Sequence, residues 1–173
     1  MTPVAAIDAF VPEHDHERCL AEALTRAREA FAARGLKLTP LRQAVFAEIA
    51  ASHRAMGAYE VLDRLAARGE RLAPISIYRA LDALVGAGIV HRFESRNAFF
   101  ACHTAHQPRQ RQLVLACEGC GRIAELSGDR VFAGIAKAAA AAGFAAKSAV
   151  VEVWGLCAAC AAQQGEHQGR HGA

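Results

Sequence analysis

Six cysteines are the residues of this 173-residue chain best suited to chemistry, and four of them fall in two C-x-x-C pairs. The first pair is Cys117 and Cys120, and the second is Cys157 and Cys160. Zinc in a structural site takes four deprotonated ligands in a tetrahedron, and a C-x-x-C turn brings two thiolates to one ion with little strain. The spacing therefore predicts one zinc ion held by all four cysteines.

The alternative use of these pairs is as redox dithiols. A redox C-x-x-C needs a helix N-terminus that lowers the pKa of one thiol, but the segment CEGCG stands between two expected strands. A closed four-thiolate site leaves no position for a reactive water, so we expect it to stabilise the fold. The chain also lacks the H-E-x-x-H motif and the H-x-E and P-C-x-x-C motifs of zinc deaminases. We therefore expect neither an enzyme nor a small-molecule substrate.

A second group of possible ligands lies in the segment ACHTAHQ, which contains Cys102, His103 and His106. These residue types suit a metal-sensing loop, a reactive thiol, or a polar loop with no ligand. The segment alone leaves the three possibilities open. Cys19 lies outside every motif and is expected to be a core thiol of the first helix, and no role is assigned to His14, His16, His167 and His171.

Composition and charge limit the class of protein. The hydrophobic fraction is 53% and the charged fraction 21%, as in folded soluble domains. The chain has no apolar run long enough for a transmembrane helix and no basic start typical of a secretory signal. A cytoplasmic protein without membrane contact is expected, in which disulfides are rare. The middle of the chain, residues 37–97, carries nine Lys or Arg against six Asp or Glu, which is compatible with nucleic acid.

The elements that must position these residues change in type along the chain. Helical periodicity extends over 15–34, 39–51, 58–68 and 74–86, and two β-rich runs joined by residues 95–97 follow as a hairpin. Thr39 and Pro40 are typical of a helix start. Three helices and a hairpin indicate a winged helix-turn-helix, which presents a helix to the DNA major groove; an ordinary helical domain with a hairpin is the alternative.

The second half of the chain has the order strand, C-x-x-C turn, strand, alanine-rich helix, strand. This order predicts a small α/β unit. The fold class is therefore α+β, with a winged-helix domain over 1–100, a metal-binding domain over 101–163, and a polar, disordered tail over 164–173.

The chain resembles the ferric uptake regulator family, and within it the zinc uptake branch, from about residue 36 to 161. The segments that carry the resemblance are LTPLRQAVFAEI, AYEVLDRL, PISIYRALDALVGAGIVHRFES, CEGCGRIAEL and VVEVWGLCAAC. The resemblance implies a homodimeric repressor of zinc-uptake genes that binds palindromic operator DNA when loaded with zinc. It implies one structural and one regulatory Zn²⁺ per protomer, with the regulatory ion fixing the angle between the two domains.

The resemblance also implies ligands for the regulatory zinc: His91, Cys102, Glu125 and a histidine at the position of Gln110. An amide oxygen is a poor zinc ligand, so His106 is expected to replace that histidine. His103 is the second choice, because in a strand it would point away from Cys102, and a three-ligand site completed by water is the remaining possibility.

On the DNA side, the resemblance implies base contacts from Tyr59 and Arg79, since an arginine can pair bidentately with guanine. An ion pair between Arg79 and Asp82 is the alternative for that side chain. The expected phosphate contacts are Ser76, Arg42, Arg92 and Arg96. The competing function on the same scaffold is a sensor of iron, of peroxide, or of thiol redox state through Cys102.

Overall fold

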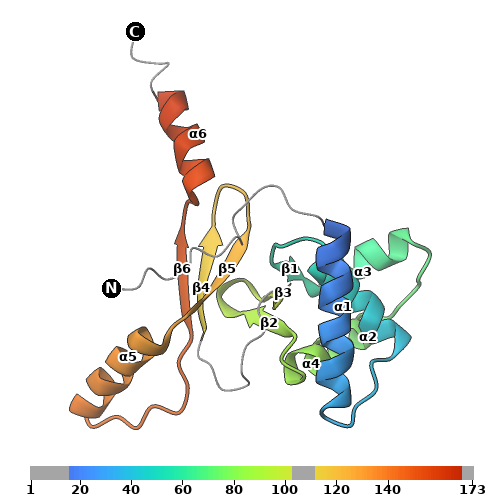
Figure 1. Cartoon of the computed structure of the whole chain (residues 1–173), viewed down its shortest axis with the longest axis horizontal. Coiled ribbons are helices and arrows are strands. Elements are labelled where there is room, and N and C mark those ends of the chain that lie inside the picture. Colours follow the sequence, from blue (N-terminus) through green and yellow to red (C-terminus); the bar gives the residue numbers. More distant parts are fainter. Residues whose placement is uncertain (1–15, 103–111, 169–173) are drawn as a thin grey trace. The chain divides into compact units, whose positions relative to one another are not determined.

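The computed structural model describes residues 16–102 and 112–168, which form two compact units (Figure 1). We call residues 16–102 the N-terminal unit and residues 112–168 the C-terminal unit, and each is described by itself. His103, His106 and Gln110 lie outside the described residues.

The N-terminal unit consists of four helices and a small sheet. Its elements follow in the order α1 (His16–Ala32), α2 (Pro40–Ala50), β1 (Met56–Gly57), α3 (Ala58–Ala67), α4 (Pro74–Gly86), β2 (Val90–Phe93), a 3-10 turn (Glu94–Arg96) and β3 (Ala98–Ala101). The two-residue β1 was not expected; it pairs with β3, which gives the strand order β1-β3-β2. Helices α2 to α4 with this hairpin form the predicted winged helix-turn-helix arrangement.

The start of each central helix is encoded locally. Thr39 is the N-cap of α2, where its hydroxyl oxygen accepts a hydrogen bond from the Arg42 backbone N–H at 3.4 Å, and Pro40 takes the first helical position. Pro74 begins α4 in the same way, but its N-cap, Ala73, has no side chain that could accept a hydrogen bond. Gly88 follows α4 at φ +75°, a conformation that glycine adopts without strain.

The core of the N-terminal unit lies between the helices. Phe31, Phe46, Ile49, Leu81 and Leu84 are almost completely buried in it. Val85 follows Leu84 directly but is 37% exposed. The reason is the helical period, which turns residue 85 away from the face shared by 77, 81 and 84.

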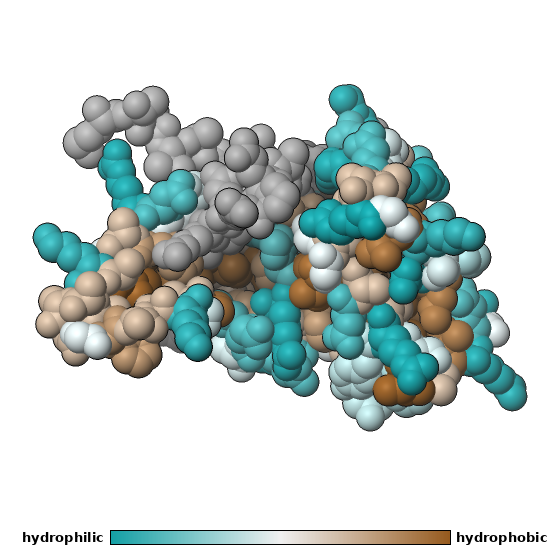
Figure 2. Space-filling view, turned by 90° about the horizontal axis from the view of Figure 1, so that it is seen from below, coloured by the Kyte–Doolittle hydropathy of each residue, from teal (hydrophilic) through white to brown (hydrophobic). Residues whose placement is uncertain are grey.

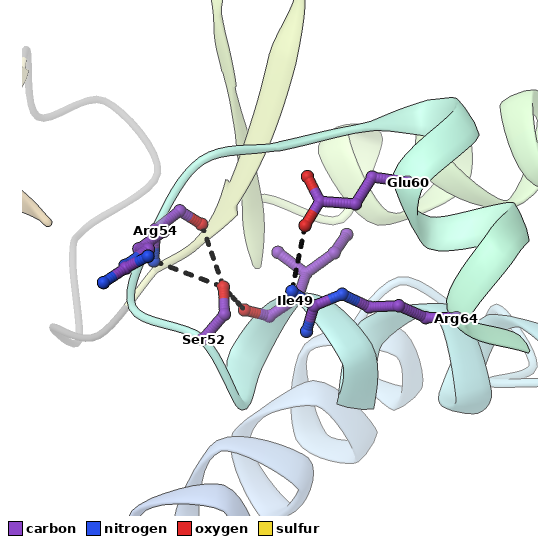
Figure 3. A network of polar contacts seen from close by, with 5 residues as sticks. All are labelled: Ile49, Ser52, Arg54, Glu60 and Arg64. Atoms are coloured by element: carbon purple, nitrogen blue, oxygen red, sulfur yellow. Dashed lines mark hydrogen bonds and ion pairs between the residues drawn. The ribbon is translucent and has the colours of Figure 1, made fainter. Parts of the chain in front are cut away.

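Polar groups fix the connection after α2 (Figure 3). The Ser52 hydroxyl donates to the Arg54 carbonyl at 3.2 Å and accepts from the Arg54 backbone N–H at 3.3 Å. On α3, Arg64 forms an exposed ion pair with Glu60 at 2.9 Å. A different pair joins α2 to the end of α3: Glu48 is 3% exposed and lies 2.7 Å from an Arg68 nitrogen.

The C-terminal unit contains a three-stranded sheet. Its elements are β4 (Gln112–Cys117), β5 (Ile123–Ser127), α5 (Asp129–Ala141), β6 (Val151–Gly155) and α6 (Ala158–Gln168). The strand order is β5-β4-β6, with β4 antiparallel to β5 and parallel to β6. Helix α5 is the crossover that the parallel pair requires. The left end of Figure 2, where α5 lies, shows apolar residues together with hydrophilic ones.

Helix α6 corrects the expectation of a disordered tail from residue 164. The helix continues to Gln168, and only residues 169–173 of that segment lie outside the described residues. The segment 158–164 consists of alanine and glutamine around Cys160, and both residue types have high helix propensity. In the described ranges, no helix is long and apolar enough to cross a membrane.

Candidate metal centres and nucleic-acid interface

The four cysteines of the C-x-x-C pairs converge at one end of the C-terminal sheet. Cys117 ends β4, Cys120 lies in the turn to β5, and Cys157 and Cys160 flank the start of α6. The parallel pairing of β4 with β6 sets Cys117 opposite Gly155, so the second pair follows directly beside the first. All four sulfur atoms lie within 4.8 Å of one another.

This geometry fits a tetrahedral zinc ion. Zinc–sulfur bonds of about 2.3 Å give a tetrahedron with sulfur–sulfur edges of about 3.8 Å. The Cys120 and Cys157 sulfur atoms lie 4.0 Å apart. The Cys157 backbone N–H donates to the Cys117 sulfur at 3.3 Å, a contact that orients a metal-binding thiolate. The residues therefore match the predicted four-cysteine structural site.

Hydrogen bonds prepare one of these thiols for metal binding. Burial opposes ionisation of Cys117, but the backbone N–H groups of Cys157, Cys120 and Gly119 and the Cys120 thiol lower its pKa to about 6. The pKa of the Cys120 thiol is raised instead, chiefly by burial. A hydrogen bond shared with Cys157, followed by burial, raises the pKa of Cys160 to about 12.

Two of the expected regulatory ligands lie together in the N-terminal unit. His91 on β2 pairs with Phe100 on β3, and their rings are 5.6 Å apart. Cys102 is two residues beyond Phe100 and therefore on the same face of the hairpin. A ring nitrogen of His91 and the Cys102 sulfur lie within 4.8 Å of each other, so this face of the hairpin offers two zinc ligands.

The third expected regulatory ligand belongs to the C-terminal unit. Glu125 is on β5 opposite Val114 of β4, and it is only 6% exposed. Carboxylates are rarely buried to this extent unless a cation or a donor compensates the charge. A metal ion bound to Glu125 would be such a cation.

The candidate DNA-binding side chains lie on helices α2 to α4 and on the wing, which is the hairpin of β2 and β3. Tyr59 is 63% exposed on the first turn of α3, and Arg79 is exposed on α4. Within the described part of the chain, Arg79 makes no ion pair with Asp82. Ser76 and Arg42 line a cavity that Arg79 also reaches.

The two wing arginines differ in their surroundings. Arg92 donates to the Asn97 side chain at 2.7 Å and lies 3.3 Å from the Glu94 carboxylate. These contacts brace a turn in which Asn97 is left-handed, with φ +48°. Arg96 lies in the 3-10 turn and is exposed. Arg92 is therefore already engaged within the hairpin.

Two features of the site were missed at the sequence level. The second cysteine pair flanks the start of α6, and the alanine and glutamine composition was the available signal for that helix. Phe100 shares the hairpin face of His91 and Cys102, and the alternation of strand residues could have indicated it.

Comparison with known proteins adds independent evidence. The family model described as the ferric uptake regulator family matches residues 33–154. The zinc uptake regulation protein of Escherichia coli K12 is 37% identical over 139 residues, which are 80% of this chain and 81% of that protein. The corresponding protein of Mycobacterium tuberculosis is 27% identical over 128 residues, 74% of this chain and 97% of that protein.

Solved structures agree with the sequence comparison. A zinc uptake regulator in complex with zinc and DNA superposes with a TM-score of 0.78 at 35% identity, over 84% of this chain and 97% of that chain. The structure of holo XcZur gives a TM-score of 0.72 at 39% identity, over 83% of this chain and 99% of that chain. By its family match, its sequence and its fold, this chain belongs to the ferric uptake regulator family.

Proposed function

We propose that this protein is a zinc-responsive transcriptional repressor that binds palindromic operator DNA as a homodimer and represses zinc-uptake genes. The observation that carries the proposal is its likeness to the zinc uptake regulator bound to zinc and DNA, combined with the four-cysteine cluster. The same cluster supports a role without catalysis, because four thiolates fill the coordination shell.

The regulatory zinc is proposed to bind His91, Cys102, Glu125 and a fourth ligand from the segment 103–111. Zinc binds imidazole and thiolate ligands more readily than harder cations do. The hairpin holds a ring nitrogen of His91 within 4.8 Å of the Cys102 sulfur. Zinc bound by these side chains then has a higher affinity for one arrangement of the two units than for the others. This difference in affinity shifts the population towards the DNA-binding arrangement.

The fourth ligand is proposed to be His106, with His103 as its substitute. Single alanine variants at the two positions test the choice. We expect His106→Ala to weaken zinc-dependent DNA binding about tenfold or more, because even the loss of a residue that only supports a metal ligand weakens metal binding about tenfold. We expect His103→Ala to retain the wild-type response. Anisotropy titrations at buffered free zinc measure both. If neither variant responds to zinc differently from the wild type, the fourth ligand is elsewhere.

The homodimer is proposed to form through the C-terminal unit. Its large exposed apolar residues are Val131, Ile135, Phe144, Val150, Val153 and Leu156. Apolar residues gathered on one small unit are typical of a protein–protein interface.

The function is tested with duplexes selected from a random pool by the zinc-loaded protein. We expect a palindromic consensus whose binding requires zinc and is unaffected by mild oxidant. Binding that ignores zinc, but is lost with oxidant and restored by thiol, would support the redox sensor instead. The burial of Cys102 disfavours that alternative, since redox-sensing cysteines are accessible.

A further inference from the structure

One face of helix α4 carries a row of exposed residues: Ile75, Arg79, Asp82 and Gly86. Their spacing of four, three and four positions places them on the same side of the helix. Ile75 begins the row, and it is 57% exposed. The row is therefore apolar at the start of α4, positive one turn later and negative beyond that.

Ile75 does not serve the fold of the N-terminal unit. Among the described residues, it belongs neither to the hydrophobic core nor to the partly buried residues that pack against that core. Ile77, two positions later, is 1% exposed and does belong to the core. A β-branched side chain also loses rotamer freedom in a helix. An alanine at position 75 would thus be at least as stable as the isoleucine.

The charges along the row select the end of α4 that can meet DNA. The first turn of α4 contains no acidic residue, and Arg79 follows one turn later. Asp82 lies seven positions after Ile75, about 10 Å along the helix axis, and its carboxylate repels phosphates. A recognition helix contacts base edges with its N-terminal residues. Ile75 and Arg79 are therefore the side chains of this row that lie nearest the bases.

The chemistry of an exposed isoleucine suits one group of the major groove. Thymine presents its 5-methyl group there, and apolar side chains recognise it by contact. Arg79 is four positions from Ile75, about 6 Å along the helix axis, and successive base pairs are about 3.4 Å apart. A thymine that contacts Ile75 should therefore lie within about two base pairs of the guanine that contacts Arg79.

We propose that Ile75 contacts the 5-methyl group of one thymine in each half-site and thereby determines specificity at that base pair. The proposal rests on the proposed function, because it names a base of the operator. Base contacts were expected from Tyr59 and Arg79 alone, and Ile75 adds an apolar contact to their polar ones. Because the side chain lies outside the core, its contribution is to discrimination between bases and not to stability.

Uracil scanning of the selected duplex tests the proposal, since uracil lacks only the 5-methyl group of thymine. One thymine of one half-site is replaced in each duplex, and binding is measured by anisotropy at buffered free zinc. We expect one position, within about two base pairs of the guanine, at which uracil weakens wild-type binding about fourfold, as loss of one buried methyl group implies. This effect should vanish in Ile75→Ala, whose melting temperature is no lower than that of the wild type.

Val85→Ala is the matched control. Val85 is a 37% exposed aliphatic residue of α4 that lies outside the row, so this variant should keep the effect of uracil. The proposal is overturned if no thymine near the guanine shows an effect, or if the effect persists in Ile75→Ala, since another side chain then contacts the methyl group. The wild type is also measured on the unmodified duplex with and without zinc. Equal binding in the two conditions would contradict the zinc-responsive function and not the thymine contact.

Discussion

At the residue scale, the four-cysteine cluster is the most strongly specified feature of the molecule. The two C-x-x-C turns predicted a zinc site, and the sulfur atoms lie within 4.8 Å of one another. A backbone N–H of the second pair already contacts Cys117 of the first. The chain thus holds the thiols close together, and zinc removes the repulsion between the thiolates.

Cys117→Ser should abolish this site. Loss of one thiolate removes much of the zinc-binding free energy, which for four-ligand structural sites is about 10–16 kcal/mol and is coupled to folding. We expect the zinc that resists mild chelation to fall from one ion per protomer to none, as measured by metal analysis. We also expect the C-terminal unit to unfold, as measured by hydrogen exchange of residues 112–168. Cys19→Ser, at a cysteine outside the cluster, is the control and should keep its zinc. A Cys117→Ser protein that retains a resistant zinc would contradict the four-cysteine assignment.

At the element scale, the ion pair between Glu48 and Arg68 ties α2 to the end of α3. Because Glu48 is 3% exposed and Arg68 is largely exposed, Arg68→Ala leaves a buried carboxylate without its cation. We expect a loss of about 2 kcal/mol in the free energy of unfolding, measured by urea denaturation. Arg64→Ala removes an exposed i,i+4 pair with Glu60 and should cost less than about 0.5 kcal/mol. Equal losses in the free energy of unfolding for the two variants would show that the burial of Glu48 does not strengthen its ion pair with Arg68.

Sequence patterns predicted the long elements better than the short ones. Thr39, Pro40 and Pro74 mark the helix starts by local chemistry, and the structure confirms them. The two-residue β1 has no periodicity of its own and exists because β3 offers it an edge. Helix α6 was missed because its polar glutamines were interpreted as a tail, whereas the cysteine cluster holds its first turn beside β4.

The candidate sites were predictable to different degrees. Spacing alone was sufficient for the four cysteines, since both pairs are local motifs. His91 and Cys102 are eleven positions apart, and only the hairpin register brings them to one face. The cavity between α2 and α4 depends on how two helices pack, which no local motif encodes.

At the scale of the whole molecule, dimerisation should depend on the apolar surface of the C-terminal unit. Val153 on β6 is 45% exposed, and an aspartate there would bury a charge in the proposed interface. We expect Val153→Asp to raise the dimer dissociation constant by about 100-fold, measured by sedimentation. Val85→Asp places the same change at a valine of α4 that is 37% exposed, and it should leave the dimer intact. Dimers of equal strength in both variants would place the interface elsewhere.

Coupling between metal and DNA is the central claim, and linkage makes it reciprocal: a zinc ion that strengthens DNA binding must itself bind more tightly when DNA is present. The most direct measurement follows zinc per protomer and operator affinity together during graded chelation. The account predicts that one zinc resists mild chelation, that a second is removed, and that operator binding falls with the second and returns when zinc is added back. Operator binding that stays constant while the removable zinc is lost would contradict the account.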